Sequence, residues 1–301
     1  MVLPMEKAPR FRRKPETIGN IRLQSRDLEI IKLAWDYRFL NSEQIQALVQ
    51  GSEQVVLRRL QKLFHHGYLD RPLSQIVFSN PLFGPQKMVY SLGDKGADLL
   101  AEEYGIDRGE ISWQEKNKEV KERYIQHTLM ISDFRTCLTL SLKNTPETKL
   151  LFWQRDNPQK LRYHVQVRDG TQQKTLSIIP DGFFCVEDPE SKMYFFLEAD
   201  RSTMTNKRYL AKMRAYWAWY RHNGTKELGF DSFRILTITK TINRRDNLAK
   251  VTQRAFDDPG GHYMFWFASQ EDFSLSNPSS TLGDIWVTAN TKSEKSHSLL
   301  E

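Results

Sequence analysis

Hydrophobic and polar positions follow a helical period from residue 25 to residue 66, and short apolar runs come after it. Apolar side chains three and four positions apart mark one face of each helix. The pattern predicts a helix that begins at Ser25, a helix from Asn41 to Gly51, a helix from Ser52 to about His66, and strands at Tyr68–Leu69 and Met88–Leu92. This order is that of a winged helix. A short helix, Ala97–Tyr104, ends the domain.

A second pattern begins with a long amphipathic helix, Asn117–Lys143. The elements expected after it are strands 150–154, 163–168, 175–179, 182–187 and 193–199, helix 206–221, strand 233–239, helix 246–256 and strand 263–268. Strand 233–239 is almost continuously apolar, as a buried parallel strand is. Helices combined with such strands predict a three-layer α/β domain.

These patterns divide the chain into five segments. We expect a basic disordered arm (1–24), a winged helix domain (25–104), a linker (105–116), a three-layer α/β domain (117–288) and a disordered, serine-rich tail (289–301). A chain of 301 residues is long enough for two such domains. The predicted fold class is therefore α/β for the second domain and α+β for the whole chain.

Positive charge is concentrated at the start of the chain. The net charge is +7, and seven basic and two acidic residues place +5 of it within residues 1–26. A basic segment ahead of a nearly neutral body indicates an electrostatic contact with a polyanion such as double-stranded DNA. The alternative is a solvated tail that has no partner.

The third helix carries the candidate DNA contacts, because a helix fits the major groove and presents its N-terminal polar residues to base edges. Ser52 and Gln54 hold these N-terminal positions. The cations expected to reach phosphates are Arg58, Arg59 and Lys62 of the helix and Arg12 and Arg13 of the arm. The alternative is the solvated side of an ordinary amphipathic helix. A winged helix also serves protein contacts, which would make replication or transfer proteins the partners, and a homodimer is a further expectation.

Several classes of protein are excluded by the sequence. The longest apolar stretches are far shorter than the roughly 20 residues that span a bilayer, and the basic start of the chain lacks the apolar segment of a secretory signal. The two cysteines, Cys137 and Cys185, have no metal-ligand spacing, which excludes a disulfide framework and a structural zinc site. We therefore expect a cytoplasmic protein without a membrane partner. Glycine-rich nucleotide-binding, serine-hydrolase and zinc-protease motifs do not occur in the sequence.

Three acidic residues are candidates for chemistry. Asp181 precedes one predicted strand, and Glu198 and Asp200 lie at the end of the next. A hairpin would bring them together, and the two-residue period of a strand puts Glu198 and Asp200 on one face. Converging carboxylates are the ligands that Mg²⁺ or Mn²⁺ prefers. The alternative is a structural ion pair in which Arg201 or Lys207 neutralises the carboxylates.

Two further features have alternative roles. His127 lies on the apolar stripe of the long helix. It is either a hydrogen-bonded core residue or a member of the acidic site. Aromatic side chains crowd helix 206–221, where they form either a base-stacking platform or core packing; they are Tyr216, Trp217, Trp219 and Tyr220.

The acidic pattern resembles the core of the PD-(D/E)XK nucleases. Pro180-Asp181 precedes the triplet Glu198-Ala199-Asp200, in which Asp replaces the usual Lys. The resemblance implies a metal-dependent DNA endonuclease or nickase that holds Mg²⁺ or Mn²⁺ through Asp181, Glu198 and Asp200. The role of the missing Lys would then pass to Lys207, Lys212 or Arg201, and otherwise cleavage is lost.

The order of motifs over residues 25–270 resembles the replication-relaxation family of plasmid and mobile-element proteins. The resemblance rests on Leu57–Leu63, Gly67–Leu69, His127, Ile179–Gly182, Phe196–Thr203 and Phe233–Thr239. It implies DNA binding linked to plasmid replication or relaxation. Three hypotheses follow: a nuclease that acts on the DNA, a non-catalytic regulator of replication or transcription, and an assembly factor whose winged helix contacts another protein.

Overall fold

The computed structural model describes residues 9–78, 87–111, 117, 120–155, 162–169, 172–222, 226–230, 232–256, 263–290 and 295–301. The chain divides into two compact units, Met1–Thr136 and Cys137–Glu301, and both combine helices with β-sheet. Within the described ranges, no helix has the length and apolarity needed to cross a membrane.

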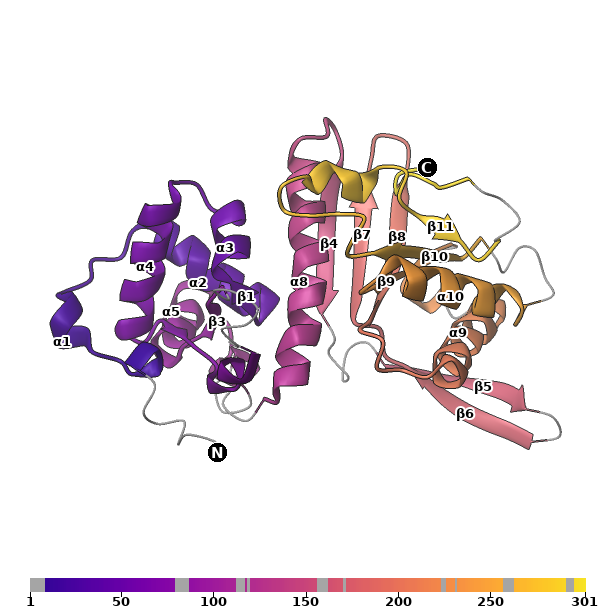
Figure 1. Ribbon diagram of the computed structural model, residues 1–301, viewed down its shortest axis with the longest axis horizontal. Helices are drawn as coiled ribbons and strands as arrows, with labels where there is room; N and C mark the ends of the chain where they lie inside the picture. Colours follow the sequence, from indigo (N-terminus) through magenta and orange to yellow (C-terminus); the bar gives the residue numbers. More distant parts are fainter. Residues whose placement is uncertain are drawn as a thin grey trace. The chain divides into compact units, whose positions relative to one another are not determined.

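The first unit combines helices with a three-stranded antiparallel sheet of order β1-β3-β2 (Figure 1). Its elements are η2 (Pro9–Phe11), α1 (Pro15–Ile18), α2 (Ser25–Tyr37), β1 (Leu40–Asn41), α3 (Ser42–Leu48), α4 (Glu53–His65), β2 (Leu69–Asp70), η3 (Leu73–Phe78), β3 (Val89–Leu92), α5 (Asp94–Tyr104) and α6 (Arg108–Ile111). The three predicted helices, the two predicted strands and the short closing helix are confirmed. Strand β1 was not predicted, because two residues are too few to show a period.

The core of the first unit is built from one face of each helix. Ile30 and Ile31 of α2, Ile45 of α3 and Leu60 of α4 are fully buried in one cluster with residues of the sheet. The ends of the helices are fixed by local hydrogen bonds. At the start of α3 the Asn41 side chain accepts from the Gln44 backbone at 2.9 Å, while the Gln44 side chain accepts from the Asn41 backbone at 2.8 Å.

Helix α8 (Glu122–Lys143) contributes to both units, because the boundary between them falls after Thr136. Ser132 Oγ donates to the Phe39 carbonyl at 2.8 Å, and Arg135 donates to the Asp36 carbonyl at 2.8 Å. The first part of α8 therefore packs on the first unit, whereas the sequence placed the whole helix in the second domain and the linker before it. Most of the predicted linker, residues 112–116, lies outside the described residues.

The described part of the arm, residues 9–24, is packed rather than disordered as the sequence predicted. The Lys14 backbone donates to His65 Nδ1 at 2.9 Å, and Arg13 donates to the Leu69 carbonyl at 3.1 Å. Ile21 and Leu23 pack against the helical core. These two apolar side chains anchor a segment whose composition is dominated by charge, which is why composition alone indicated disorder.

The second unit is organised around a six-stranded sheet of order β11-β10-β9-β8-β7-β4. Strands β8, β9 and β10 are parallel, while β7, β4 and β11 are antiparallel to their neighbours. The elements are β4 (Lys149–Arg155), β5 (Tyr163–Asp169), β6 (Gln172–Ile178), β7 (Gly182–Glu187), β8 (Lys192–Asp200), α9 (Asn206–Arg221), η5 (Lys226–Leu228), β9 (Arg234–Thr239), α10 (Ile242–Gln253), β10 (Phe265–Ser269), η6 (Pro278–Leu282) and β11 (Val287–Thr288). Every predicted strand and helix of this part of the chain is confirmed, while β11 was not predicted.

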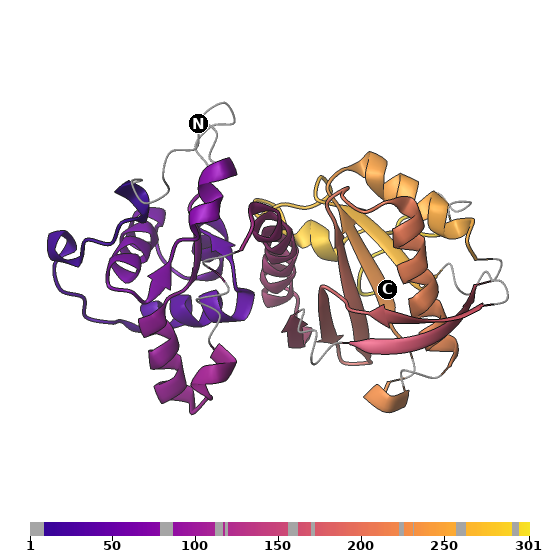
Figure 2. The same ribbon diagram turned by 90° about the horizontal axis from the view of Figure 1, so that it is seen from below.

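Helices α9 and α10 cover one face of this sheet (Figures 1 and 2). Tyr209 and Met213 of α9 and Leu248 of α10 share a buried cluster with Phe196 of β8 and Phe265 of β10. Strands β5 and β6 form a separate two-stranded ribbon, which packs on α9. The Tyr163 ring of that ribbon stacks on Trp219 at 4.6 Å.

The described part of the predicted disordered tail, residues 289–290 and 295–301, is also packed. The backbones of Trp286 and His297 exchange hydrogen bonds of 3.2 and 2.8 Å, and Leu299 is fully buried. Arg234 donates to the Leu299 carbonyl at 3.0 Å. The serine-rich composition concealed the buried apolar side chains Ala289 and Leu299, which hold this segment in place.

A buried ion pair connects α2 and α4 in the first unit. Asp27 at the start of α2 is fully buried, and it accepts from the Gln24 backbone at 2.7 Å and from Arg59 Nε at 2.7 Å. Arg59 also donates to the Arg22 carbonyl at 3.1 Å, so its guanidinium is held inside the fold. The neighbouring Arg58 is exposed. Arg59 thus neutralises Asp27, and its predicted contact with a DNA phosphate stays a prediction.

We expect Arg59→Ala to destabilise the protein by about 3–5 kcal/mol, because it leaves the buried Asp27 carboxylate without its cation. Arg58→Ala, one position away on the same helix, should change stability by no more than about 0.5 kcal/mol. Urea unfolding of the full chain measures both. Equal effects of the two substitutions would contradict a structural role for Arg59.

Candidate functional site

The hairpin of β7 and β8 brings together two acidic residues that are far apart in sequence. Gly182 pairs with Leu197 in the register of the two strands. The Asp181 backbone donates to the Leu197 carbonyl at 2.9 Å, and the Asp181 carboxylate accepts from the Ala199 backbone at 2.8 Å. Asp181 thus lies beside Glu198, as the hairpin argument predicted.

Glu198 is buried, with 5% of its surface exposed. Its carboxylate contacts Lys212 Nζ and accepts from Tyr216 Oη at 2.6 Å. Burial raises the pKa of Glu198 to about 7, against the opposing effects of Lys212 and Tyr216. Burial lowers the pKa of Lys212, but the Glu198 and Asp181 carboxylates outweigh this effect and leave that pKa above its ordinary value. The lysine is therefore cationic at neutral pH.

Asp200 has a different cation. Arg244 Nη2 donates to the Asp200 carboxylate at 2.7 Å and also to the Met204 carbonyl at 2.7 Å. The Ser202 backbone donates to the other Asp200 oxygen at 2.5 Å, in a turn where Ser202 has φ of +61°. Arg244 is placed by α10, whose first turn is capped by Thr241. Asp200 therefore joins β8, the following turn and α10.

Two other predicted site residues are Lys207 and His127. Lys207 is exposed near the start of α9 and is five residues before Lys212. Five residues correspond to about 140° around a helix, so Lys207 and Lys212 lie on different faces. Among the two lysines, only Lys212 contacts Glu198, and the choice of Lys207 as cationic partner is corrected accordingly. His127 lies in the part of α8 that belongs to the first unit, and it is half-buried.

The acidic cluster does not have the form of a metal site. Within the described ranges, no group of three His, Cys, Asp or Glu side chains is arranged to hold a metal ion. Both Glu198 oxygens accept from Lys212 and Tyr216, and both Asp200 oxygens accept from Arg244 and the Ser202 backbone. A Mg²⁺ or Mn²⁺ ion would have to displace two cations of the chain itself. The residues present therefore do not fit the predicted metal.

The outer face of α4 forms a second candidate site, in the first unit. Val56, Leu60, Leu63 and Phe64 turn inward and are buried. The other side exposes polar, apolar and cationic side chains, which are Gln54, Val55, Leu57, Arg58 and Gln61, with Lys62 half-buried beside them. Ser52, directly before the helix, is exposed as well. The only acidic residue of α4 is Glu53, at its first position.

A short turn fixes the direction of α4. Residues 49–52 connect the end of α3 to the start of α4, and Gly51 in this turn has φ of +128°. A side chain would strain the backbone in this region, so glycine is favoured there. Short turns that contain glycine also join the two helices of helix-turn-helix motifs.

Two cations of the arm, Arg12 and Arg13, are both exposed, and Arg13 also contacts the first unit. Arg13 lies 3.3 Å from the Asp70 carboxylate and donates to the Leu69 carbonyl, so its charge fastens the arm to β2. The contact of Arg13 with DNA stays a prediction. Arg12 is exposed.

The Glu198 site generates a prediction about pH. The stability of the wild type relative to Glu198→Gln should be greatest below about pH 4.5, where the carboxyl is protonated in both states. It should fall by up to about 3 kcal/mol as the pH rises through about 7, because the unfolded chain releases this proton at lower pH than the folded protein does. Urea unfolding at about pH 5 and about pH 8 measures the difference. The exposed Glu190→Gln is the control, and a difference that grows with pH would contradict the raised pKa.

The comparisons with known proteins agree with the family indicated by the motifs. The profile of the Replication-relaxation family matches residues 33–230, about two thirds of the chain. The matched range includes α4, the β7–β8 hairpin and α9. No curated protein and no solved structure matches the chain. On the strength of the profile match, the chain belongs to the Replication-relaxation family.

Proposed function

We propose that this protein binds duplex DNA in the replication or relaxation of a plasmid or mobile element, and that α4 of the first unit enters the major groove as in a winged helix. Membership in the Replication-relaxation family supports the biological role. The outer face of α4 carries the proposal of DNA binding, because it exposes polar and cationic side chains directly after a four-residue turn. The order α2, α3, α4, β2 and β3 supports the winged helix arrangement.

The proposed contacts divide into two kinds. Ser52 and Gln54 lie at the start of α4, the end of a recognition helix that contacts base edges. Val55 and Leu57 are 39% and 40% exposed, and apolar side chains in such positions contact thymine methyl groups.

The phosphate contacts fall to fewer residues than the sequence suggested. Arg58 and Lys62 are four residues apart and lie on the same side of α4, where they can contact one DNA strand. Arg12 is the stronger candidate in the arm. Arg59 is the weakest candidate, because the buried Asp27 carboxylate holds its guanidinium, and Arg13 is a weaker candidate than Arg12 because it also contacts Asp70.

In this proposal the second unit does not cut DNA. The protein is then a non-catalytic regulator. Glu198 and Asp200 each have a cation of the same chain, which a metal ion would have to displace. These contacts argue against a nuclease mechanism through Asp181 and Glu198. An assembly factor that uses α4 to contact a protein is the remaining alternative, and the binding experiment below separates it from DNA binding.

We expect the double variant Arg58→Ala and Lys62→Ala to weaken binding to duplex DNA and to reduce the slope of log affinity against log salt by about 2, or about 1 for each lost phosphate contact. Fluorescence anisotropy with a labelled duplex, recorded over a range of salt concentrations, measures both quantities. Stability should not change, because neither side chain is buried.

The matched control removes two exposed cations from the second unit, Lys207→Ala with Lys250→Ala. It should leave the salt slope unchanged. Absence of duplex binding by the wild type even at about 50 mM salt would overturn the proposal and favour the assembly factor. An equal loss in the control would show non-specific attraction rather than contact through α4.

A second experiment tests the non-catalytic assignment. Supercoiled plasmid incubated with the wild-type protein and Mg²⁺ or Mn²⁺ should remain supercoiled, because the carboxylates are already neutralised by Lys212 and Arg244. Asp181→Ala and Glu198→Ala are run beside it. Open circles or linear plasmid made by the wild type and by neither variant would establish a nuclease at this acidic site and contradict the assignment.

A further inference from the structure

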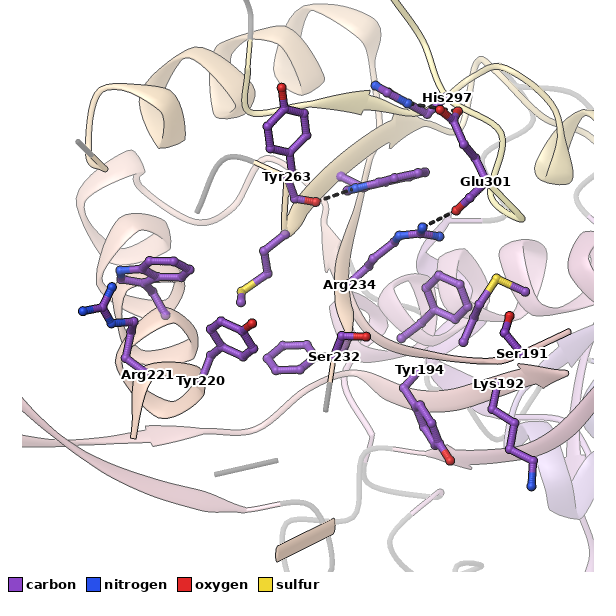
Figure 3. A pocket seen from close by; sticks show the side chains of 16 residues that line it. Ser191, Lys192, Tyr194, Tyr220, Arg221, Ser232, Arg234, Tyr263, His297 and Glu301 are labelled. Carbon is purple, nitrogen blue, oxygen red and sulfur yellow. Dashed lines mark hydrogen bonds and ion pairs between the residues drawn. The ribbon is translucent and has the colours of Figure 1, made fainter. Parts of the chain in front are cut away.

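A cavity of about 860 Å³ lies in the second unit, at the edge of the sheet where the parallel strands begin (Figure 3). Its walls come from the first residues of β8, β9 and β10 and from the last turn of α9. The volume is within the range of about 300–1,000 Å³ that ligand pockets have. Glu198 and Asp200 lie at the other ends of the same strands. The cavity is therefore separate from the acidic cluster.

Aromatic side chains dominate the walls of the cavity, and they are Tyr194, Phe195, Trp217, Tyr220, Phe233, Tyr263 and Trp266. Trp217 and Tyr220 are half-buried, with ring centroids 5.8 Å apart and planes inclined by 29°. Tyr194 stacks on Phe230 at 4.3 Å. Core rings thus support these side chains from behind. Tyr263 stands at the rim with 54% of its surface exposed.

The described cavity walls are positively charged. Lys192, Arg221 and Arg234 line them, and Glu301 is the single acidic side chain among the described lining residues. Lys192 Nζ also lies 3.5 Å from the Glu187 carboxylate, but 54% of its side chain is exposed. Glu301 already forms ion pairs with Lys295 and His297, and hydrogen bonds from these two residues lower its pKa. Arg234 lies over the Trp266 ring at 4.3 Å and fixes that wall. Arg221 is exposed at the rim, 5.8 Å from the Trp217 ring.

We propose that this cavity binds unstacked bases of single-stranded DNA, with Trp217, Tyr220 and Tyr263 offering stacking surfaces and with Arg221 and Lys192 close to the phosphates. Aromatic rings beside exposed cations are the combination by which proteins hold single strands, since every base has a face that can stack and every nucleotide has a phosphate. A base inside a duplex cannot reach rings that lie within a cavity. The site is therefore selective for DNA whose strands have separated.

This inference does not depend on the proposed function, because the residues belong to the second unit and none of them is in α4. It assigns part of the aromatic cluster of α9 to binding. Tyr216 and Trp219 are buried in the core, whereas Trp217 and Tyr220 line the cavity.

The test uses the full chain and a fluorescein-labelled oligothymidylate of about 12 nucleotides, a length that a single-strand site covers. Tyr263→Ala and Arg221→Ala change the rim, and both residues are exposed, so the fold should persist. We expect each to weaken oligothymidylate binding at least about fivefold, the equivalent of about 1 kcal/mol for a stacked base. Affinity for duplex DNA should stay unchanged. Oligothymidylate should also quench the tryptophan fluorescence of the wild type.

Two matched substitutions serve as controls. Tyr104→Ala removes an aromatic residue of similar exposure, 51%, from the first unit, and Lys250→Ala removes an exposed cation from α10. Neither should alter oligothymidylate binding. The proposal is overturned if the wild type does not bind oligothymidylate, if the rim variants bind it as the wild type does, or if the controls lose as much affinity.

The variants of α4 separate this inference from the proposed function. The double variant Arg58→Ala and Lys62→Ala should lose duplex binding and keep oligothymidylate binding. If the wild type binds oligothymidylate but not duplex DNA, the assignment of the cavity stands and only the role of α4 is overturned. If it binds duplex DNA but not oligothymidylate, the role of α4 stands and the assignment of the cavity is overturned.

Discussion

Folding buries carboxylates in both units of this protein, and each buried carboxylate has a cation from the same chain. Asp27 is paired with Arg59, and Glu198 is paired with Lys212. Removing one partner of such a pair leaves a charge that water cannot reach, at a cost of several kcal/mol. The position of α4 against α2, and of α9 against β8, depends on these pairs being complete. The apolar core determines which faces of the helices pack together. The ion pairs then determine which residues of these faces are in contact.

The same constraint separates cations that are available to a partner from cations that are not. Arg58 and Arg59 are adjacent in sequence, yet one is exposed and the other is held by Asp27. Arg244 lies at the edge of an open α/β sheet, a position where an arginine is often taken as a phosphate contact, and it neutralises Asp200 instead. A count of basic residues therefore overstates the surface that nucleic acid can use. The positions of the buried carboxylates indicate which cations remain available to a partner.

Local patterns were sufficient to predict most of the fold. Helix α9 begins and ends at the predicted residues, 206 and 221, because helical period and flanking polar residues are properties of neighbouring positions. The β7–β8 hairpin, and with it the approach of Asp181 to Glu198, followed from two-residue alternation and the turn between the strands. The packing of the arm and of the tail was missed, because a few apolar side chains such as Ile21 and Leu299 anchor segments of otherwise polar composition.

The partners of the acidic residues could not be predicted in the same way. Lys207 and Lys212 are both on α9, and only the rotation of this helix against the sheet decides which one faces Glu198. Tyr216, four residues after Lys212, lies on the same side of the helix and contacts the same carboxylate. The spacing of four residues between Lys212 and Tyr216 is visible in the sequence. Which face of α9 turns toward Glu198 depends on tertiary packing.

The two edges of the parallel strands differ in the side chains that they carry, and this difference bears on function. Ligands of open α/β sheets are usually bound beyond the carboxyl ends of the strands. Here that edge carries Glu198 and Asp200, and Lys212 and Arg244 neutralise them from α9 and α10. The amino-terminal edge instead has the aromatic and cationic cavity. A ligand at the carboxyl edge would have to break two ion pairs. The cavity, in contrast, is lined by rings that core residues already support. Binding at the amino-terminal edge therefore requires the smaller rearrangement of the second unit.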